Sequence, residues 1–543
     1  MMKVFLVLVV CIHGIVEAGS LLDTPGVTPV EALIAPIQKL RGVDAVAKAL
    51  GLKKPFSLED VLSEDLPGAV TRHRLALLYN DLRVLVFTIQ ATSDADGYFT
   101  GSASGYIPTI SNLDTSVKVS VKDLKQATAD YVNSKNIRQD IGNIAAKDVS
   151  RFTATKAIHV DKLTGVPRVV YFCEGVVDTI PSYNRWPRVL FDALTLRVII
   201  GSVQVRYADN DDTLDVLGSI LGKGTDKSCP SIQGGNQKYP FPVYGPGRNQ
   251  VCLNAEVKGK KCSLANKRVT IKSLENGMDV SKAKVVSFKC EDGLSDGING
   301  ASSPASDAYY YGQKFYDFLE EWGNVDTKDY DPIDIFVHYG NNFDNSFFDG
   351  ASIYLGDGSS LLFPLASPEI IAHELCHRET ARFGNLKFES ESLAIDESHS
   401  DICGRAFSAY LQIVADDNWD FGANIVKQSN LALRYFDDPT RDNWSIKNVN
   451  DFDRTTNPFQ AVGIFNSVYN SLVEQHNFSH RDAFRTFLLA NRLYWQEETD
   501  FQNGACGVKR AAKDLRLNVA AVDSAFGAVG IPLTSCSTLG GGR

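Results

Sequence analysis

The segment from His373 to His377 constrains this chain more than any other. It reads His-Glu-x-x-His, and Glu397 follows twenty residues after its second histidine. On a helix, positions i and i+4 lie on one face, so both imidazoles can face one metal ion. Glu374 then lies beside that ion, where it can act as a base on a water molecule. A carboxylate from a second helix, Glu397, would complete a zinc site with an open fourth position, which is typical of catalytic zinc.

Two buried histidines on a core helix are the simpler explanation of the motif, but the stretch that follows argues against it. Residues 392–404 predict a second helix that carries the third ligand and, one turn later on the same face, Asp401. Histidine ligands usually donate their second ring N–H to a carboxylate. We therefore expect Asp401 to orient His373 and Asp396 to orient His377, around one Zn²⁺ ion per chain.

The region from His373 to Gly404 resembles the active site of the thermolysin-type zinc metallopeptidases, in particular their vibriolysin and pseudolysin branch. The interval between the second histidine and Glu397 matches that family. Further segments resemble the family's catalytic domain, and together they extend over most of residues 209–543. These segments are 234–238, 300–304, 307–312, 337–346, 432–435, 490–495 and 504–514.

The resemblance implies an α+β fold with a two-lobed catalytic domain. Its β-rich first lobe would be residues 235–370, and the zinc helix with the helical second lobe would be residues 371–543. The residues themselves agree with this division. Strand-like alternation and Gly and Asn turns prevail in the first part, whereas patterns of helical period dominate from Ser367 onward.

The resemblance also implies a reaction, the hydrolysis of internal peptide bonds. Glu374 would take a proton from the zinc-held water and deliver it to the leaving amine. Asn345 and Ser346 match edge-strand positions that pair with the substrate main chain, and 337–346 resembles that strand. Arg434 matches an arginine that holds the substrate carbonyl on the leaving side. A turn asparagine and a surface arginine are the structural alternatives for these positions.

Two positions depart from the family in the groups that stabilise the developing oxyanion. Where the family has a tyrosine the chain has Phe388, and where it has a histidine oriented by an aspartate the chain has Phe459 and Asn457. Phenylalanine donates no hydrogen bond, and losing one such donor lowers turnover by roughly 10²–10³-fold. The chain is therefore either a zinc endopeptidase, a zinc-binding pseudo-peptidase of low turnover, or an enzyme in which another residue replaces the lost donors.

The family's calcium site departs as well. The positions that match its four acidic residues are Glu369, Arg405, Ser408 and Asp416. An arginine at a ligand position argues against calcium, whose ligands are oxygens. We expect the guanidinium of Arg405 to lie between Glu369 and Asp416 in place of the ion.

The N-terminal residues predict a secreted precursor. Residues 1–18 have the positive end, the apolar run and the small residues near the cut that are typical of a signal peptide. Residues 19–208 contain strand-like runs and resemble the propeptide of the family, a fungalysin/thermolysin propeptide segment followed by a PepSY-like one. Such a propeptide would assist folding and inhibit the enzyme; an unrelated accessory domain is the alternative. Residues 209–234 are polar and predict the maturation linker.

Secretion favours disulfides among the ten cysteines. The resemblance implies the pairs Cys262–Cys290 and Cys506–Cys536, and a bridge between Cys229 and Cys252 is plausible. Cys376 and Cys403 lie on the two zinc helices, facing away from the metal. They could form a bridge or be small buried side chains, and we favour burial. For Cys173 we expect burial rather than a thiol that reaches the zinc.

Composition sets the remaining limits. The chain is 44% hydrophobic and 22% charged, as in soluble globular proteins, and its net charge of −10 gives no reason to expect nucleic acid as a partner. No stretch of the mature chain is long and apolar enough to cross a membrane. We expect an extracellular monomer whose partners are peptide substrates and its own propeptide.

Overall fold

The computed structural model describes nine stretches of the chain and divides it into two compact units. The described residues are 27–34, 40–134, 144–161, 164–177, 185–205, 229–245, 250–413, 418–453 and 455–536. The first unit is Met1–Tyr207 with Asp514–Arg516 and Thr534–Arg543, and the second is Ala208–Lys513 with Leu517–Leu533. Our predictions for the signal peptide, for residues 209–228 of the linker and for Asp416 lie outside the described residues.

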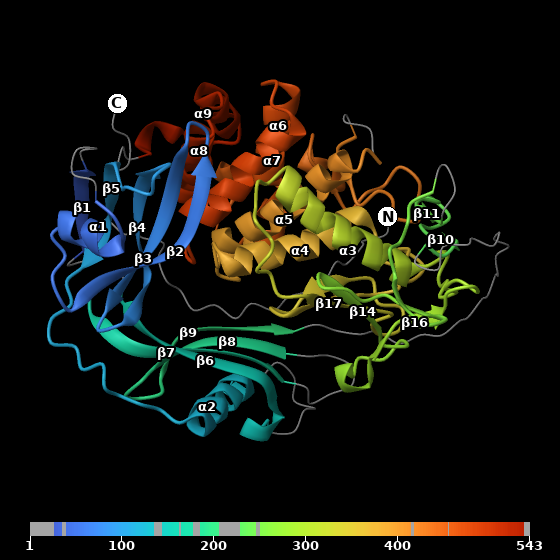
Figure 1. Cartoon of the computed structure of the whole chain (residues 1–543), viewed down its shortest axis with the longest axis horizontal. Helices are drawn as coiled ribbons and strands as arrows, with labels where there is room; N and C mark the ends of the chain where they lie inside the picture. Colours follow the sequence, from blue (N-terminus) through green and yellow to red (C-terminus); the bar gives the residue numbers. More distant parts are fainter. Residues whose placement is uncertain are drawn as a thin grey trace. The chain divides into compact units, whose positions relative to one another are not determined.

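The first unit is built on a nine-stranded sheet (Figure 1). Its strands follow the order β1-β5-β4-β6-β7-β8-β9, with β3 beside β4 and β2 beside β3. Most neighbours are antiparallel, and one parallel pairing, between Val84 and Ile158, joins β4 to β6. The elements are β1 (Val27–Ile34), α1 (Val43–Ala49), β2 (Phe56–Leu66), β3 (Val70–Tyr79), β4 (Leu82–Asp94), β5 (Gly101–Pro108), α2 (Val121–Ser134), β6 (Val149–Val160), β7 (Pro167–Val177), β8 (Arg185–Asp192) and β9 (Val198–Val205).

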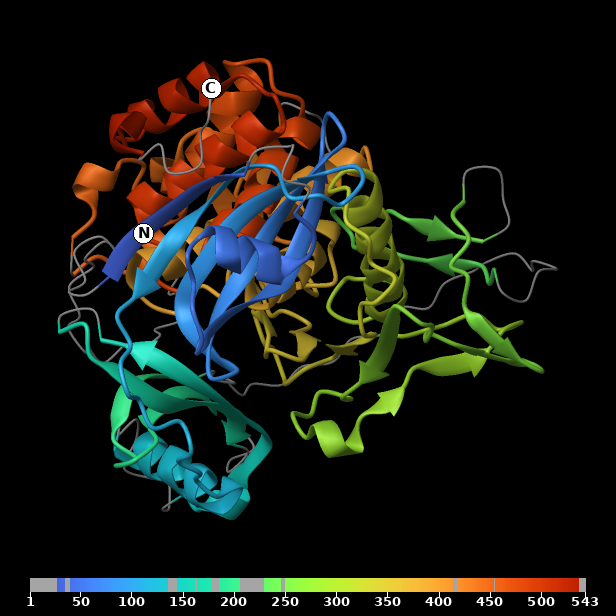
Figure 2. The same ribbon diagram turned by 60° about the vertical axis from the view of Figure 1, so that its left-hand side comes forward.

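Helix α2 covers one face of the second half of this sheet (Figure 2). Leu124 and Tyr131 of α2 share a core with Tyr171 and Cys173 of β7, while Val170, which precedes Tyr171, belongs to a separate core on the opposite face. Side chains alternate between faces along a strand, so β7 is apolar on both sides. The Cys173 thiol is fully buried, as predicted, and burial raises its pKa to about 12.

The first lobe of the second unit contains a five-stranded sheet in the order β15-β14-β17-β19-β18. Strand β18 is therefore at its edge and pairs antiparallel with β19, Ser346 opposite Leu355. We predicted an edge strand at 337–346, but the structure ends β17 at Val337 and begins β18 at Ser346. The strands and helix of this lobe are β10 (Ile232–Gln233), β11 (Val243–Tyr244), β12 (Glu256–Lys258), β13 (Lys261–Ser263), β14 (Val269–Ser273), β15 (Lys284–Val285), β16 (Ser287–Lys289), α3 (Pro304–Glu321), β17 (Ile333–Val337), β18 (Ser346–Phe348) and β19 (Ser352–Leu355).

The second lobe is mostly helical, as the sequence predicts. Its helices pack around a dense aromatic and aliphatic core that includes Phe465, Tyr469 and Phe487. The elements are α4 (Pro368–Arg382), α5 (Ser390–Tyr410), β20 (Asp420–Phe421), β21 (Arg434–Tyr435), α6 (Val462–Glu474), α7 (His480–Leu489), a π-helical turn (Ala490–Tyr494), α8 (Phe501–Asp514) and α9 (Val519–Ala528).

Helices α4 and α5 lie against each other and hold the motif residues. The Ser367 side chain caps α4 by accepting from the Ile370 N–H at 3.5 Å, and Pro368 occupies the first turn, where its missing N–H costs nothing. Gly404 lets α5 approach closely, because a Cβ there would lie 2.5 Å from the carbonyl oxygen of Glu369. The two helices are thus fixed at short distance near the ligands.

Four pairs of cysteines bear on the disulfide predictions. Cys262–Cys290 is a disulfide, as predicted, and Cys506 and Cys536 are both disulfide-bonded, as the predicted pair requires. Our preference for two separate buried thiols at Cys376 and Cys403 is wrong, because these cysteines form a disulfide between α4 and α5. Their positions on facing helices indicated burial, but no sequence pattern gives the distance between two sulfurs. Cys229 is buried and Cys252 half-buried, and the bridge between them stays a prediction.

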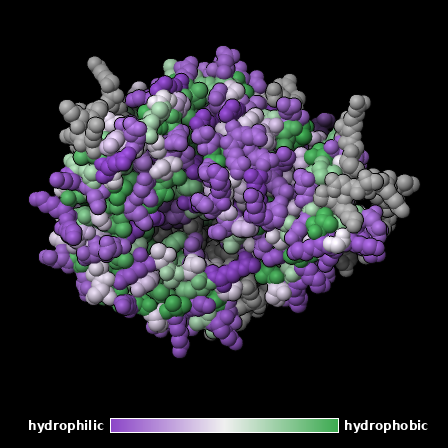
Figure 3. Space-filling view, in the orientation of Figure 1, coloured by the Kyte–Doolittle hydropathy of each residue, from purple (hydrophilic) through white to green (hydrophobic). Residues whose placement is uncertain are grey.

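On the face of the molecule seen in Figure 3, hydrophilic residues predominate and hydrophobic ones lie in small groups. Among the described residues, no helix is long and apolar enough to span a bilayer.

Candidate zinc site

The four motif residues converge at the contact of α4 and α5. The Nε2 atoms of His373 and His377 lie 3.1 Å apart, and the Glu397 carboxylate lies 3.5 Å from the first and 3.6 Å from the second. One ligand atom from each of the three residues falls within 4.8 Å of the other two. His373 and Glu397 are buried and His377 is nearly so. Two imidazoles and one carboxylate around a common point are a donor set that suits zinc.

Each histidine is oriented by a partner on its other ring nitrogen. Nδ1 of His373 donates to Asp401 at 3.0 Å. Nδ1 of His377 lies 3.2 Å from the Asp396 carboxylate and 3.1 Å from the Ser400 hydroxyl. Nε2 is thereby left to face the metal position in both rings. Sequence reasoning missed Ser400, although its place three residues after Glu397, on the same face of α5, could have indicated it.

Asp401 is itself held by two residues from outside the zinc helices. Arg434 donates to both of its carboxylate oxygens, and the Asn466 amide donates to one of them at 2.8 Å. Asn466 in turn accepts from the Ser398 hydroxyl at 2.6 Å. We assigned Arg434 to substrate alone, and the structure places it on the carboxylate that orients His373. Sequence reasoning missed Asn466, because nothing in its spacing tied it to Asp401.

The charges around the ligands favour a bound cation. Burial alone would lower the pKa of His373, but its hydrogen bonds to Asp401 and Glu397 and their charges raise it to about 10. Burial would raise the pKa of Asp401, but Arg434 and His373 hold it at about 2. The pKa of Glu397 is also lowered, by His377 and His373 against the effect of burial. Carboxylates that stay ionised around two imidazoles stabilise positive charge at their centre, which a divalent metal supplies.

Glu374, the proposed base, points toward the edge strand. It is 4% exposed, and the Ser346 hydroxyl at the start of β18 donates to its Oε1 at 2.6 Å. Asn345, the residue before, is half-buried, and its carbonyl oxygen accepts from the Gly356 N–H at 3.1 Å. The structure thus brings the base, the edge strand and the metal ligands into one site.

The two aromatic departures lie on turns beside the helices. Phe388 is half-buried in the loop between α4 and α5, and Phe459 is half-buried in the 3₁₀ turn Pro458–Ala461 before α6. Asn457 caps that turn, since its side chain accepts from the Phe459 N–H at 3.0 Å. It has a structural task where the family has an orienting aspartate.

Three of the four residues that match the family's calcium ligands, Glu369, Arg405 and Ser408, are buried where α5 passes the start of α4. Glu369 accepts from the Gly422 N–H at 2.8 Å. Burial raises the pKa of Glu369 to about 7, while this backbone bond, the charge of Arg405 and the Ser408 hydroxyl lower it. The Arg405 guanidinium is fully buried and lies 5.0 Å above the Trp419 ring. A cation therefore already accompanies Glu369 in this chain.

A second group of possible metal ligands, Cys376, His399 and Cys403, lies behind the zinc ligands. Its two sulfurs are joined in the disulfide, so they do not serve as thiolate ligands. His399 is fully buried, and burial lowers its pKa to about 4. This group therefore joins the two helices rather than holding an ion.

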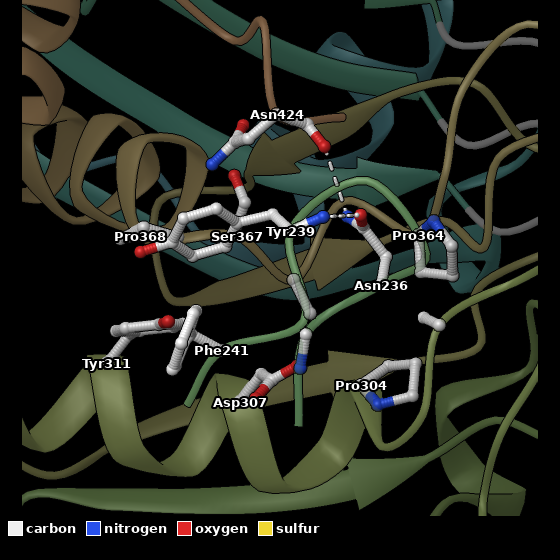
Figure 4. Close-up of a pocket in the computed structure, with 13 residues that line it drawn as sticks. Asn236, Tyr239, Phe241, Pro304, Asp307, Tyr311, Pro364, Ser367, Pro368 and Asn424 are labelled. Carbon is white, nitrogen blue, oxygen red and sulfur yellow. Dashed lines mark hydrogen bonds between the residues drawn. The ribbon is translucent and has the colours of Figure 1, made fainter. Parts of the chain in front are cut away.

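A small pocket of about 10 Å³ lies at the N-terminal end of α4, lined by residues other than the metal ligands (Figure 4). Asn236 and Tyr239 reach it from the segment after β10, and the Asn236 amide donates to the Asn424 carbonyl at 3.1 Å. The Gly235 N–H donates to Asp307 of α3 at 2.8 Å. The chain a few residues after Cys229 therefore packs against the second unit and forms hydrogen bonds with it.

Comparison with known proteins gives matches over most of the second unit. Residues 244–380 match the family described as "Thermolysin metallopeptidase, catalytic domain", and residues 384–531 match "Thermolysin metallopeptidase, alpha-helical domain". The chain is 29% identical over 477 residues to the "Virulence metalloprotease" of Vibrio anguillarum, which covers 87% of this chain and 73% of the relative. It is 30% identical over 473 residues to the "Neutral protease" of Vibrio proteolyticus, covering 86% and 72%. A solved structure, the precursor of protealysin from Serratia proteamaculans, aligns with a TM-score of 0.43 at 20% identity, covering 52% of this chain and 91% of that one.

Proposed function

This chain belongs to the thermolysin family of metallopeptidases, in its vibriolysin branch, and on that premise we propose that it is a secreted endopeptidase made as a precursor. The observation that carries the proposal is the convergence of His373, His377 and Glu397 on one point with Glu374 beside it. The donor set and the partners of both Nδ1 atoms fit zinc.

The reaction follows from the positions of the side chains. Bound zinc would polarise the substrate carbonyl and acidify a water molecule. Glu374 takes the proton of that water and delivers it to the leaving amine, so no covalent intermediate with the protein is needed. Asp401 and Asp396 keep both imidazoles in the ligating tautomer. The reaction is peptide hydrolysis, in which the OH of water joins the carbonyl carbon and its proton goes to the leaving amine.

Substrate binding is assigned to the edge of the first lobe. An extended peptide can add to β18 as a further strand, beginning at Asn345 and Ser346. An edge strand accepts the middle of a chain as readily as its end, which supports cleavage of internal bonds. We assign Arg434 to the substrate carbonyl on the leaving side, held in place by its two hydrogen bonds to Asp401.

The direct test is a peptidase assay on the processed protein with Glu374→Gln. We expect kcat to fall by about 10²–10⁴-fold, because a general base contributes that much, while zinc content stays at one per chain. Glu275→Gln, the same change at a 73% exposed side chain, serves as the matched control. Equal turnover in wild type and Glu374→Gln would reject the assignment of the base. Wild-type protein that is purified without chelators and contains no zinc would reject the assignment of the zinc site.

A second candidate function is a zinc-binding pseudo-peptidase that captures peptides without efficient cleavage. The observation in its favour is that Phe388 and Phe459 stand where the family has donors to the oxyanion. Zinc would then stabilise the developing charge almost alone. Turnover near zero with intact zinc and intact peptide affinity would favour this candidate over the first.

Maturation is proposed to separate the propeptide from the catalytic part of the chain. The propeptide would be residues 19–208, following the leader at 1–18. We place the cut before Cys229. This position lies within the 209–234 linker that the composition suggested, but before its last six residues. Cys229 is 3% exposed and Gly235 is bonded to Asp307, so a cut after Cys229 would remove packed chain from the catalytic unit (Figure 4). N-terminal sequencing of the secreted protein tests this placement.

A further inference from the structure

The hydroxyl of Ser346 is the starting point of an inference about how the base is held. It donates to Oε1 of Glu374 at 2.6 Å, from the first residue of β18 to the middle of α4. Among the residues that the structure describes, Ser346 is the only hydrogen-bond partner of the Glu374 carboxylate. One side chain therefore decides which way this carboxylate turns.

A glutamate that must act as a base needs one oxygen directed at the water and little freedom to turn away. Its long side chain has several rotamers, and every rotamer that points elsewhere lowers the reactive fraction. Glu374 is 4% exposed, so bulk water contributes little to holding it. A hydrogen bond to an ionised carboxylate is about twice as strong as one between neutral groups. The Ser346 hydroxyl can thus fix Oε1 and leave the second oxygen for the reaction.

We propose that Ser346 is a positioning residue for the reaction: its side chain orients Glu374 while its main chain belongs to the strand that receives the substrate. This inference rests on the proposed function. Binding of substrate to β18 and orientation of Glu374 are then coupled through Ser346. No oxyanion role is assigned to Ser346, since its hydroxyl faces the base.

The test uses an isosteric pair of variants in protein expressed as the full chain, allowed to process and loaded with zinc. Ser346→Val removes the hydroxyl, and Ser346→Thr has the same shape with the hydroxyl retained; both suit a strand. Ser287→Val is the same change on β16, at a half-buried strand position away from the site. Zinc content of every variant is measured by mass spectrometry, so loss of metal is seen separately.

We expect kcat of Ser346→Val to fall by about 10- to 100-fold, the effect of a hydrogen bond to a charged group, with KM changed by less than about twofold. Ser346→Thr should recover most of that loss, and Ser287→Val should match the wild type. Wild-type kcat in Ser346→Val, equal losses in the Val and Thr variants, or a change in KM alone would overturn the proposal.

A second measurement keeps the test independent of turnover. A peptide hydroxamate binds zinc and also pairs with a properly oriented glutamate, so its affinity by calorimetry reports the position of Glu374. Weaker binding in Ser346→Val than in Ser346→Thr supports the positioning role, and equal binding rejects it. If the wild type binds zinc and hydroxamate but cleaves no peptide, the proposed peptidase function fails while the role of Ser346 is still decided.

Discussion

Asp401 is fully buried and accepts hydrogen bonds from the side chains of His373, Arg434 and Asn466. A buried carboxylate is costly unless it is paired and hydrogen-bonded, and these three partners meet that requirement. Burial would raise the pKa of Asp401, but Arg434 and His373 hold it at about 2, so the carboxylate is ionised near neutral pH. A single residue thereby orients a zinc ligand and holds the arginine assigned to substrate.

Replacing Asp401 by asparagine should weaken zinc binding by about 10–100-fold, the usual effect of losing an orienting carboxylate. It should also lower the free energy of unfolding by about 3–5 kcal/mol, because Arg434 would be left without its counter-charge in a mostly buried place. Competition with a chelating dye measures the first effect and denaturant unfolding the second.

Asp396→Asn is the matched control for that variant. Nδ1 of His377 has the Ser400 hydroxyl at 3.1 Å as a second partner, so the loss of zinc affinity should be smaller. A larger loss in Asp396→Asn than in Asp401→Asn would contradict the role given to Asp401.

Phe459 is the residue at which the proposed loss of an oxyanion donor can be tested. The double variant Phe459→His with Asn457→Asp should raise kcat by about 10–100-fold if the oxyanion lacks a donor. The change is structurally mild, because an aspartate at 457 can still accept from the backbone N–H that Asn457 now caps. Steady-state kinetics on one peptide measure it. An unchanged kcat, with zinc retained, would indicate that another group already stabilises the charge.

At the scale of elements, α4 and α5 act as one rigid pair. All three proposed zinc ligands lie on these helices, which approach at Gly404 and are joined by Cys376–Cys403. A rigid pair holds its ligands at the right separation before the metal arrives, so less ordering is required on binding. The disulfide next to the ligands therefore bears on metal affinity as well as on stability.

Removing that disulfide with Cys376→Ala and Cys403→Ala should lower the free energy of unfolding by about 2–4 kcal/mol and also weaken zinc binding. The matched control is Cys262→Ala with Cys290→Ala, whose sequence separation of 28 is close to the 27 of the first pair. Chain entropy predicts similar losses of stability for both. Only the first pair should change zinc affinity, measured by chelator competition; equal effects on zinc would contradict the inference.

How far the sequence alone predicts these elements depends on the range of the interaction. The ligands His373 and His377 follow from helical period, and the two lobes follow from the change of period near Ser367. The role of Asn466 depends on how separate helices meet and has no signal in the sequence, whereas the spacing of Ser400 after Glu397 is such a signal. Burial was favoured over the Cys376–Cys403 bond because that bond also depends on how two helices meet. The start of the edge strand was misplaced because the residue types just before Ser346 suit a loop as well as a strand.

At the scale of the whole molecule, the question is what stabilises an enzyme that has an arginine at one of the positions matching its family's calcium ligands. Glu369 is 3% exposed, and burial raises its pKa to about 7 although Arg405 acts in the opposite direction. Arg405 is fully buried and stacks on Trp419. A fixed guanidinium in this cluster, together with the disulfides, would make stability independent of the calcium concentration outside the cell.

Calcium removal should therefore leave the melting temperature unchanged, and loss of Arg405 should lower it. In zinc-buffered EGTA, we expect a shift below about 1 °C, since nothing that binds the folded state is withdrawn. Arg405→Met keeps the length of the side chain but leaves Glu369 without its cation, and should cost about 3 kcal/mol of unfolding free energy. Adding Glu369→Gln to Arg405→Met should recover part of that loss, because the buried charge is then gone. Stoichiometric calcium in the purified protein, or a large fall in melting temperature in EGTA, would show that the ion is bound in spite of the arginine.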